Sequence, residues 1–330
     1  MNCLTTYERP ARSVARVLAT ILAIGLLAGC ADDVPVAPRS VPVTSGMLAL
    51  NGRGGKPPLG KIAFSRGLSE FSQSIFVMNA DGSGMQRITD GSSDESPAWS
   101  PDYKSLVFVR ASITGYHELM KYTFGKGKLE SLVTMGGAVQ NPAWSPDGAT
   151  IAFDMWEGGN RDVFVMDADG TNIQRLTTSA GEDRHPSWSP DGQRIAYESE
   201  SSGNREIHVM HRSGTGHTQV TSCLALFTSQ CKSPAWSPVP GDERIVYATD
   251  RPDAYQIHVI NADGSNRATL LTNTHTNDSR PRWSRDATHI AFESRMVGGG
   301  GDIFSMRADG SGVTQLTPAS TTEHYPAWSR

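Results

Sequence analysis

The sequence predicts an all-β fold, a six-bladed β-propeller with four antiparallel strands in each blade. Three observations lead to this prediction: a tryptophan motif that recurs at a regular interval, short apolar runs at fixed places within the interval, and a length that fits six copies. Successive tryptophans are 45, 44, 48, 47 and 45 residues apart. Periods of about 40 to 45 residues that hold four short strands are typical of propeller blades. The six tryptophans are Trp99, Trp144, Trp188, Trp236, Trp283 and Trp328.

The other strands of each repeat are indicated by short apolar runs between turn residues. In the third repeat, "PAW" ending at Trp144 is followed by "IAF" from Ile151, "VFVM" from Val163 and "RLT" from Arg175. No apolar period of 3.6 residues runs through the repeats, so a helical solenoid does not fit. The 271 residues from Gly60 to the end hold six repeats of about 45 residues.

The phase of the repeat predicts how the ring closes. The first repeat opens at its second strand, at Ile62, and the last copy ends at its first strand, at Trp328. We therefore expect Pro326 to Ser329 to supply the inner strand of a blade whose other strands come from about residues 61–90. Such a pairing would remove the free edges that an open ring leaves.

The repeated residues have a structural interpretation. In "WSPDG" the proline presets φ and the glycine accepts a positive φ, so the motif predicts a tight turn between the first two strands. Three copies depart from the motif: Tyr103 and Ala287 occupy the glycine position in two of them, and the third, "SPVPGDERIVY", is longer. We expect those hairpins to differ in shape. The tryptophans are expected to pack between neighbouring blades. The Asp-x-Asp-Gly of Asp167 to Gly170 is interpreted as a hairpin turn, because it lacks the spaced acceptors of a calcium loop.

The N-terminal segment has the features of an export signal. A basic region with Arg9, Arg12 and Arg16 precedes the apolar run 17–27, which is short for a membrane span. The run leads into "LLAGC", which resembles the bacterial lipoprotein box, where cleavage precedes a cysteine that becomes lipidated. That cysteine is Cys30.

Three segments follow from this interpretation: a lipoprotein signal peptide at 1–29, a flexible tether at 30–59 and the propeller at 60–330. The tether is predicted from its proline and glycine content and its lack of periodicity. Removing the signal leaves 27 Lys and Arg against 33 Asp and Glu, a net charge of about −6. An acidic chain argues against nucleic acid as a partner. Ala31 after the cysteine favours an outer membrane as the site of the anchor.

Two cysteines remain in the predicted propeller, Cys223 and Cys231. In an exported chain, two nearby cysteines favour a local disulfide over two free thiols. A zinc site is not expected, because no further cysteine and no nearby histidine could complete it.

Candidate binding residues lie just before each tryptophan motif, where the repeats stop agreeing. Varied polar residues on a rigid ring are typical of a binding rim, although solvated loop residues would give the same pattern. The candidates are Asp94, Glu95, Asp183, Arg184, His185, Asp278, Arg280, Glu323 and His324. No catalytic residue is assigned, because the sequence contains no hydrolase elbow, nucleotide loop or zinc-protease motif.

The pattern "PAWSPDG…IAF…FVM(N/D)ADG…RLT" resembles the repeat of the TolB-type six-bladed propellers over about 270 residues. The resemblance implies an extracytoplasmic platform that binds partner proteins, without cofactor or metal. The chain departs from that family in its apparent lipid anchor and in having only a short tether before the propeller.

The leading hypothesis is a monomeric, membrane-anchored scaffold of the bacterial cell envelope that binds a protein or glycan. Related propellers also include polysaccharide lyases with a histidine-bound metal, so a metal-dependent lyase is the alternative, with His185 and His324 as its first candidates. A structural or sensory scaffold without a small ligand is a third possibility.

Overall fold

The computed structural model describes residues 60–69, 72–90, 93–112, 116–223, 230–250, 255–270, 276–296, 300–318 and 321–329. The predicted signal peptide, Cys30 and the tether lie outside the described residues. Within the described residues no helix is long and apolar enough to cross a membrane.

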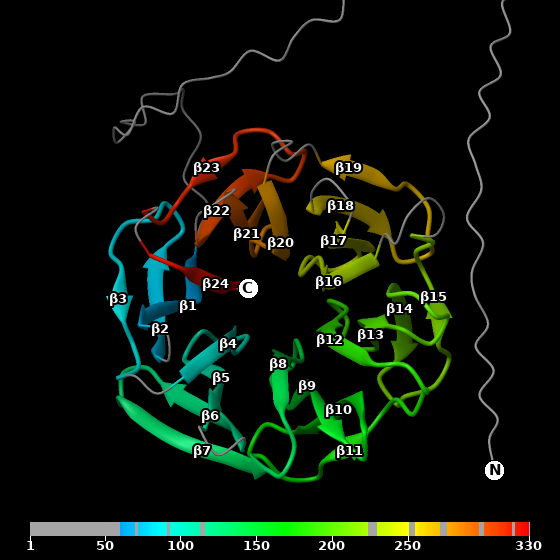
Figure 1. The fold of residues 1–330 in the computed structure, drawn as a ribbon, viewed down its shortest axis with the longest axis horizontal. Coiled ribbons are helices and arrows are strands. Elements are labelled where there is room, and N and C mark those ends of the chain that lie inside the picture. Colours follow the sequence, from blue (N-terminus) through cyan, green and yellow to red (C-terminus); the bar gives the residue numbers. More distant parts are fainter. Residues whose placement is uncertain are drawn as a thin grey trace, which may run out of the picture. The chain divides into compact units, whose positions relative to one another are not determined.

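The described chain is built of short β-strands arranged around a central axis (Figure 1). In chain order the strands are β1 (Lys61–Ser69), β2 (Ser72–Asn79), β3 (Gln86–Arg87), β4 (Ser93–Trp99), β5 (Ser105–Ala111), β6 (His117–Thr123), β7 (Lys128–Met135), β8 (Val139–Trp144), β9 (Thr150–Glu157), β10 (Asn160–Asp167), β11 (Gln174–Arg175), β12 (Asp183–Trp188), β13 (Arg194–Ser199), β14 (Glu206–His211), β15 (Thr218–Gln219), β16 (Gln230–Trp236), β17 (Arg244–Asp250), β18 (Tyr255–Asn261), β19 (Ala268–Leu270), β20 (Thr276–Trp283), β21 (His289–Met296), β22 (Gly301–Arg307), β23 (Thr314–Gln315) and β24 (Glu323–Trp328).

The strands of each sequence repeat pair antiparallel in the expected order, so the four-stranded propeller blade is confirmed. We number the repeats by sequence. Repeat 1 comprises β24, β1, β2 and β3, and repeats 2 to 6 comprise β4–β7, β8–β11, β12–β15, β16–β19 and β20–β23. The first strand of each repeat is the inner one and lies nearest the centre of the ring (Figure 1).

The prediction of six separate blades needs a correction. Among the described residues the hydrogen-bonded sheets number five: repeats 3 to 6 form four sheets of four strands, and repeats 1 and 2 share one sheet of eight. The reason is a single parallel bridge between β2 and β4, at Gln73 and Ser93, which links two otherwise four-stranded arrays.

Repeat 1 is assembled from both ends of the described chain. Strand β24 pairs antiparallel with β1, with Trp328 opposite Ile62 and Ala327 opposite Ala63. The Ser329 amide also donates to the Lys61 carbonyl, at 2.8 Å. The pairing predicted from the phase of the repeat is therefore present.

The six tryptophans of the motif pack as predicted, each against the preceding repeat. Trp188 shares a buried cluster with Ala152 and Val163 of repeat 3, and its indole N–H donates to the Ala143 carbonyl at 3.1 Å. Trp283 donates in the same way to Ala235. Corresponding clusters contain the other four tryptophans. The apolar core is thus a series of junctions between neighbouring repeats.

The turn after the motif keeps one shape even where glycine is replaced. Tyr103, Gly148 and Ala287 have φ of 60°, 71° and 51°, and each donates its amide to the serine three residues earlier, at 2.9 to 3.0 Å. The expectation that the Tyr103 and Ala287 hairpins differ in shape is therefore wrong. A left-handed non-glycine residue costs on the order of 1 kcal/mol, which the hydrogen bonds of the turn offset.

Candidate functional site

The candidate site lies where the inner strands begin. Within an antiparallel blade, the start of the first strand and the turn between the second and third strands lie at one end, and the "SPDG" turns lie at the other. Six inner strands, one from each repeat, bring their first residues to that end around the axis (Figure 1). Ser96, Asn141 and Tyr325 of these strands line the central cavity.

Each inner strand contains the same backbone irregularity. The residue before the motif proline has a φ between 51° and 55°, and the pairing with the second strand shifts register at this point. A residue that precedes proline is disfavoured in helical conformations, and a left-handed non-glycine residue is strained. Such bulges turn a side chain away from the regular pleat and are common beside functional sites. The six residues are Ser96, Asn141, His185, Ser233, Arg280 and Tyr325.

Three buried carboxylates hold these bulges in place. They occupy one position in three repeats, directly after the apolar run of the second strand: Asp154 on β9, Glu198 on β13 and Glu293 on β21. All three are at most 1% exposed. We call the six left-handed residues and these three carboxylates the polar mouth.

Asp154 connects repeats 3 and 4. Its Oδ1 accepts from the side-chain amide of Asn141 at 2.8 Å and from the backbone amide of His185 at 3.0 Å. Its Oδ2 accepts from Arg161 at 2.6 Å. One carboxylate therefore ties the bulge of its own repeat to the bulge of the next.

Glu198 repeats this arrangement between repeats 4 and 5. Its Oε2 lies 3.2 Å from Nδ1 of His185 and accepts from the backbone amide of Ser233 at 3.1 Å, while Arg205 lies 3.3 Å from Oε1. Burial raises the pKa of Glu198, but the charge and hydrogen bond of His185 and the charge of Arg205 outweigh it and bring the pKa to about 2. The carboxylate is therefore ionised at neutral pH.

Glu293 connects repeats 6 and 1. It accepts from Arg280 at 2.6 Å and contacts His324 Nδ1 at 2.8 Å and Arg295 at 3.2 Å. Burial raises its pKa, but the hydrogen bond from His324 and the charge of Arg280 outweigh this effect and bring the pKa to about 2. The Arg280 guanidinium also stacks on the ring of Tyr325, 4.1 Å from its centroid.

The structure divides the nine residues predicted for the rim into two groups. Four are at most 1% exposed and lie inside the blades: Asp94, Asp183, Asp278 and Glu323. Asp94 pairs with Arg110 at 2.7 Å and Glu323 with Arg66 at 2.9 Å. These four acids are buried within the blades and are not exposed at the mouth. Each lies in an inner strand, two residues before the left-handed residue.

The remaining five predicted residues lie at the mouth. His185 and Arg280 are left-handed residues of the bulge, and Glu95, Arg184 and His324 directly precede such residues. Burial raises the pKa of Glu95, although the charges of His117, Arg280 and His324 oppose the shift. Burial lowers the pKa of Arg184, and repulsion from Arg205 adds to the effect. The mouth thus combines acids and bases from several repeats.

Sequence reasoning missed the three carboxylates and their arginine partners. A signal was present: an acid follows "IAF" or "IAY" in repeats 3, 4 and 6. In repeats 3 and 4, "NRD" and "NRE" place Arg161 and Arg205 two residues before the residue that pairs with the acid. In repeat 6 the position of Arg161 and Arg205 is taken by Gly301. A Cβ at this glycine would lie 3.1 Å from Glu293 and 3.2 Å from His324.

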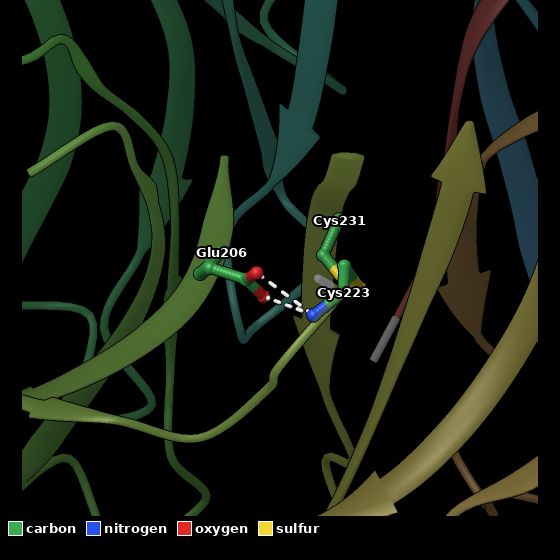
Figure 2. A group of neighbouring side chains, drawn as sticks. All are labelled: Glu206, Cys223 and Cys231. Atoms are coloured by element: carbon green, nitrogen blue, oxygen red, sulfur yellow. Dashed lines mark hydrogen bonds between the residues drawn. A yellow bond between two sulfur atoms is a disulfide. The ribbon is translucent and has the colours of Figure 1, made fainter. Parts of the chain in front are cut away.

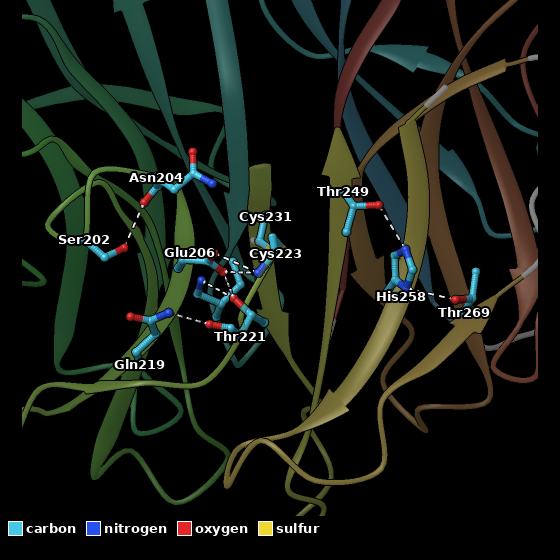
Figure 3. Close-up of a disulfide and its surroundings, with 11 residues drawn as sticks. Ser202, Asn204, Glu206, Gln219, Thr221, Cys223, Cys231, Thr249, His258 and Thr269 are labelled. Carbon is cyan, nitrogen blue, oxygen red and sulfur yellow. Dashed lines mark hydrogen bonds between the residues drawn. A yellow bond between two sulfur atoms is a disulfide. The ribbon is translucent and has the colours of Figure 1, made fainter. Parts of the chain in front are cut away.

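Cys223 and Cys231 are joined by a disulfide, with Cα atoms 6.1 Å apart (Figures 2 and 3). The buried Glu206 beside it accepts from the Cys223 amide at 2.8 and 2.9 Å and from Thr221 Oγ1 at 2.6 Å. On the neighbouring blade His258 lies between Thr249 and Thr269 (Figure 3). Glu206 and the two cysteines are close enough to hold a metal, but sulfurs joined in a disulfide are not thiolate ligands.

The histidines of the mouth are not gathered at one point. His185 contacts Glu198, whereas His324 contacts Glu293 of another repeat. Within the described part of the chain, no other group of three potential ligands is close enough to hold a metal.

Comparison with known families decides the relationship. The family model of the TolB β-propeller domain matches residues 117–223 and 217–330, well over half of the chain. The chain belongs to the TolB β-propeller family. No curated protein matches this TolB-family chain.

Solved structures agree with the fold of this TolB-family chain. TolB from Acinetobacter baumannii superposes with a TM-score of 0.70 at 22% identity, over 82% of this chain and 66% of that one, just under two thirds of its length. A putative TolB from Agrobacterium tumefaciens gives 0.64 at 20% identity, over 82% and 92%. An oligogalacturonate lyase from Vibrio parahaemolyticus gives 0.53 at 12% identity, over 75% and 72%. At these identities the likeness concerns the fold.

Proposed function

We propose that this TolB-family chain is an extracytoplasmic binding scaffold of the cell envelope, and that a partner protein docks on the polar mouth. The observation that carries the proposal is the repeated clamp of Asp154, Glu198 and Glu293 on strained bulges. Strained residues that are held by the surrounding structure are characteristic of binding sites. The pairing of β24 with β1 would close a ring of six blade units into one rigid frame.

The chemistry of the mouth fits a protein partner. Arg184, Arg280 and Tyr325 are of the residue types that are enriched in the energetic centres of protein interfaces. The mouth carries both acids and bases, so a partner with a complementary pattern of both charges would be selected over a uniformly charged one. Binding of this kind needs no cofactor and no covalent chemistry.

The membrane anchor completes the proposal. An acyl-modified Cys30 and a tether over 30–59 would hold a monomeric propeller at a membrane surface, and the absence of Asp after the cysteine favours the outer membrane. Replacing Cys30 by alanine should release the protein from the membrane fraction. Membrane retention of the Cys30→Ala protein would contradict the anchor while leaving the binding proposal open.

The binding proposal is tested with a photo-crosslinking amino acid in intact cells. The probe replaces Arg184 at the mouth, and in the matched control it replaces Asp263 in an exposed turn at the opposite end of the blades. The expected result is one discrete cross-linked protein from position 184 and none from position 263. Equal cross-linking from both ends would contradict a specific mouth.

The glycan and lyase alternatives are separated with the purified protein. Uronate polymers are incubated with it and examined for new unsaturated ends, while bound metal is measured. Cleavage that His324→Ala abolishes would replace the scaffold proposal with an enzyme. Binding of a polymer without cleavage would identify a glycan, and not a protein, as the ligand of the mouth.

A further inference from the structure

A second cavity, of about 720 Å³, lies away from the polar mouth, at the end of the blades that holds the "SPDG" turns. It is situated between repeats 1 and 2. Val77, Ile88, Trp99 and Phe124 form its apolar wall. Its polar edge is formed by Lys61, Gln86, Tyr103, Arg285, Asp286 and Ser329. A volume of this size, with apolar walls and few polar groups, is characteristic of small-molecule sites.

The cavity exists because the repeat is broken at this junction. At four other junctions, the glycine in the turn between the third and fourth strands lies directly against the preceding repeat. A Cβ on Gly82, Gly170, Gly214 or Gly264 would lie 2.8, 2.4, 2.9 or 3.1 Å from the carbonyl oxygen of Leu316, Leu132, Leu176 or Val220. In repeat 2 the turn has a different form: Lys126 stands at the position of these glycines, and a Cβ on the neighbouring Gly125 or Gly127 would meet nothing within 4 Å.

The aromatic wall is also particular to this junction. Four of the motif tryptophans lie under a lysine or arginine: Trp144, Trp188, Trp236 and Trp283. Trp99 is instead covered by Phe124, which stacks on it at 5.2 Å with an interplanar angle of 18°. The pair presents an extended apolar surface to the cavity, which suits an alkyl chain or a flat ring.

The edge of the cavity is cationic. Lys61 donates to Asn79 at 3.2 Å, and the guanidinium of Arg285 lies 5.1 Å from the ring centroid of Tyr103. Neither cation forms an ion pair with a described carboxylate. The neighbouring Asp286 is already occupied, because its Oδ1 accepts from two hydroxyls and a backbone amide of its own turn, at 2.7 to 3.1 Å.

We propose that this cavity binds a single-chain amphiphile with a carboxylate head. The chain lies along Trp99 and Phe124, and the carboxylate accepts from Arg285 and Lys61. Burial of the chain against the apolar wall favours binding, and the guanidinium selects an anionic head over a neutral one. The site is independent of the polar mouth, so either can exist without the other.

The test is calorimetric titration of the full chain with decanoate, decan-1-ol and decyltrimethylammonium below their micellar concentrations. Decanoate should bind with one site per chain and at least ten times more tightly than the alcohol, and the ammonium should bind more weakly still. Absence of decanoate binding, or equal binding of the acid and the alcohol, would overturn the proposal.

Two variants locate the site. Arg285→Gln should weaken decanoate at least fivefold without changing the alcohol, and Lys104→Gln, an exposed cation of a nearby turn that does not line the cavity, should change neither. Ile88→Trp fills the cavity and should abolish binding. The folding of the Arg285→Gln and Ile88→Trp proteins is checked by melting curves. Because Arg285 is exposed, its replacement should leave the fold intact. Decanoate binding that survives both substitutions would place the ligand elsewhere.

Discussion

The junction between repeats 3 and 4 and the junction between repeats 1 and 2 are built from the same sequence motif, yet only the first is sealed. At the former, Gly214 lies against Leu176, Trp188 donates to Ala143, and Arg212 covers the indole at 5.7 Å. At the latter the turn has a different form. When the turns are aligned on the amide bonds from Phe124 to Lys104 and from Arg212 to Gln193, Lys126 stands at the position of Gly214, and a Cβ on the preceding Gly125 would touch nothing. Phe124 replaces the cation, and the Trp99 N–H has no partner among the described residues.

The comparison of the two junctions shows that the regular spacing of the motif is not sufficient to fill a junction. The tryptophan alone does not close a junction, since Trp99 is as regularly placed as Trp188. At the junction between repeats 3 and 4 a turn glycine and a cation on the indole both fill space, and both are missing at the junction between repeats 1 and 2, which holds the larger cavity. At the junction between repeats 1 and 2, the departure from the repeat therefore coincides with a cavity that could hold a ligand.

The largest expected effect concerns the junction that both chain ends build. Deleting residues 325–330 removes Trp328, which is 4% exposed, and half of the β24 pairing. Loss of a buried tryptophan alone costs about 3–5 kcal/mol, so the melting temperature should fall by roughly 10 °C or more. Circular dichroism of the truncated and parent proteins measures it. A truncated protein as stable as its parent would show that β24 does not hold the ring together.

The next effect compares the two junctions directly. Trp188→Ala should lower the free energy of unfolding by about 3–5 kcal/mol, because it removes buried contacts and a hydrogen bond. Trp99→Ala should cost less, because one side of this indole already borders a cavity. Urea denaturation of both variants gives the difference. A larger loss for Trp99 would mean that the open junction contributes more to stability than the sealed one.

Reduction of the disulfide should have a somewhat smaller effect. The bond closes a loop between cysteines eight positions apart, which corresponds to about 2.5 kcal/mol of loop entropy in the unfolded chain. Melting curves with and without a thiol reductant measure the loss. The double variant Cys223→Ala, Cys231→Ala serves as control and should not respond to the reductant. Identical curves for the unmodified protein would indicate free thiols.

The smallest effect depends on pH. Asp302 is 5% exposed; burial and repulsion from Glu323 raise its pKa to about 6, above the unfolded value of about 3.8. Because the folded pKa is raised, its contribution to stability is complete below pH 4 and is lost as the pH rises through about 6. Asp302→Asn should therefore stabilise the protein by about 1–2 kcal/mol at pH 8 and by nothing at pH 3. A benefit that is equal at both pH values would show that charge is not its cause.

Much of the fold could be predicted from the sequence because its signals recur. Six copies of one motif indicate the number of repeats, and the phase of the first and last copies predicts the pairing of β1 with β24. The bridge between Gln73 and Ser93 could not be predicted, since it depends on the close approach of two strands and not on either residue type.

The sequence indicated a region for the candidate site, but it did not indicate which side chains are exposed there. Variation before the motif pointed to the strand starts, where the structure places His185, Arg280 and His324 beside the buried carboxylates. It cannot separate them from Asp94 and Glu323, because alternation within a strand decides which side chain faces the axis, and the bulge before the proline breaks that alternation. The clamping carboxylates were overlooked because their signal lies on the next strand.

The most direct test of the sealing account is a pair of glycine substitutions at matched backbone geometry. Gly214 and Gly125 have φ of 77° and 76°, so a Cβ meets the same intrinsic strain at both. At position 214 it also meets the Leu176 carbonyl oxygen at 2.9 Å, whereas at position 125 it meets nothing. Urea denaturation should show Gly214→Ala to be about 1–3 kcal/mol more destabilising than Gly125→Ala. Equal losses for the two variants would contradict the claim that the packing of Gly214 on Leu176 seals its junction.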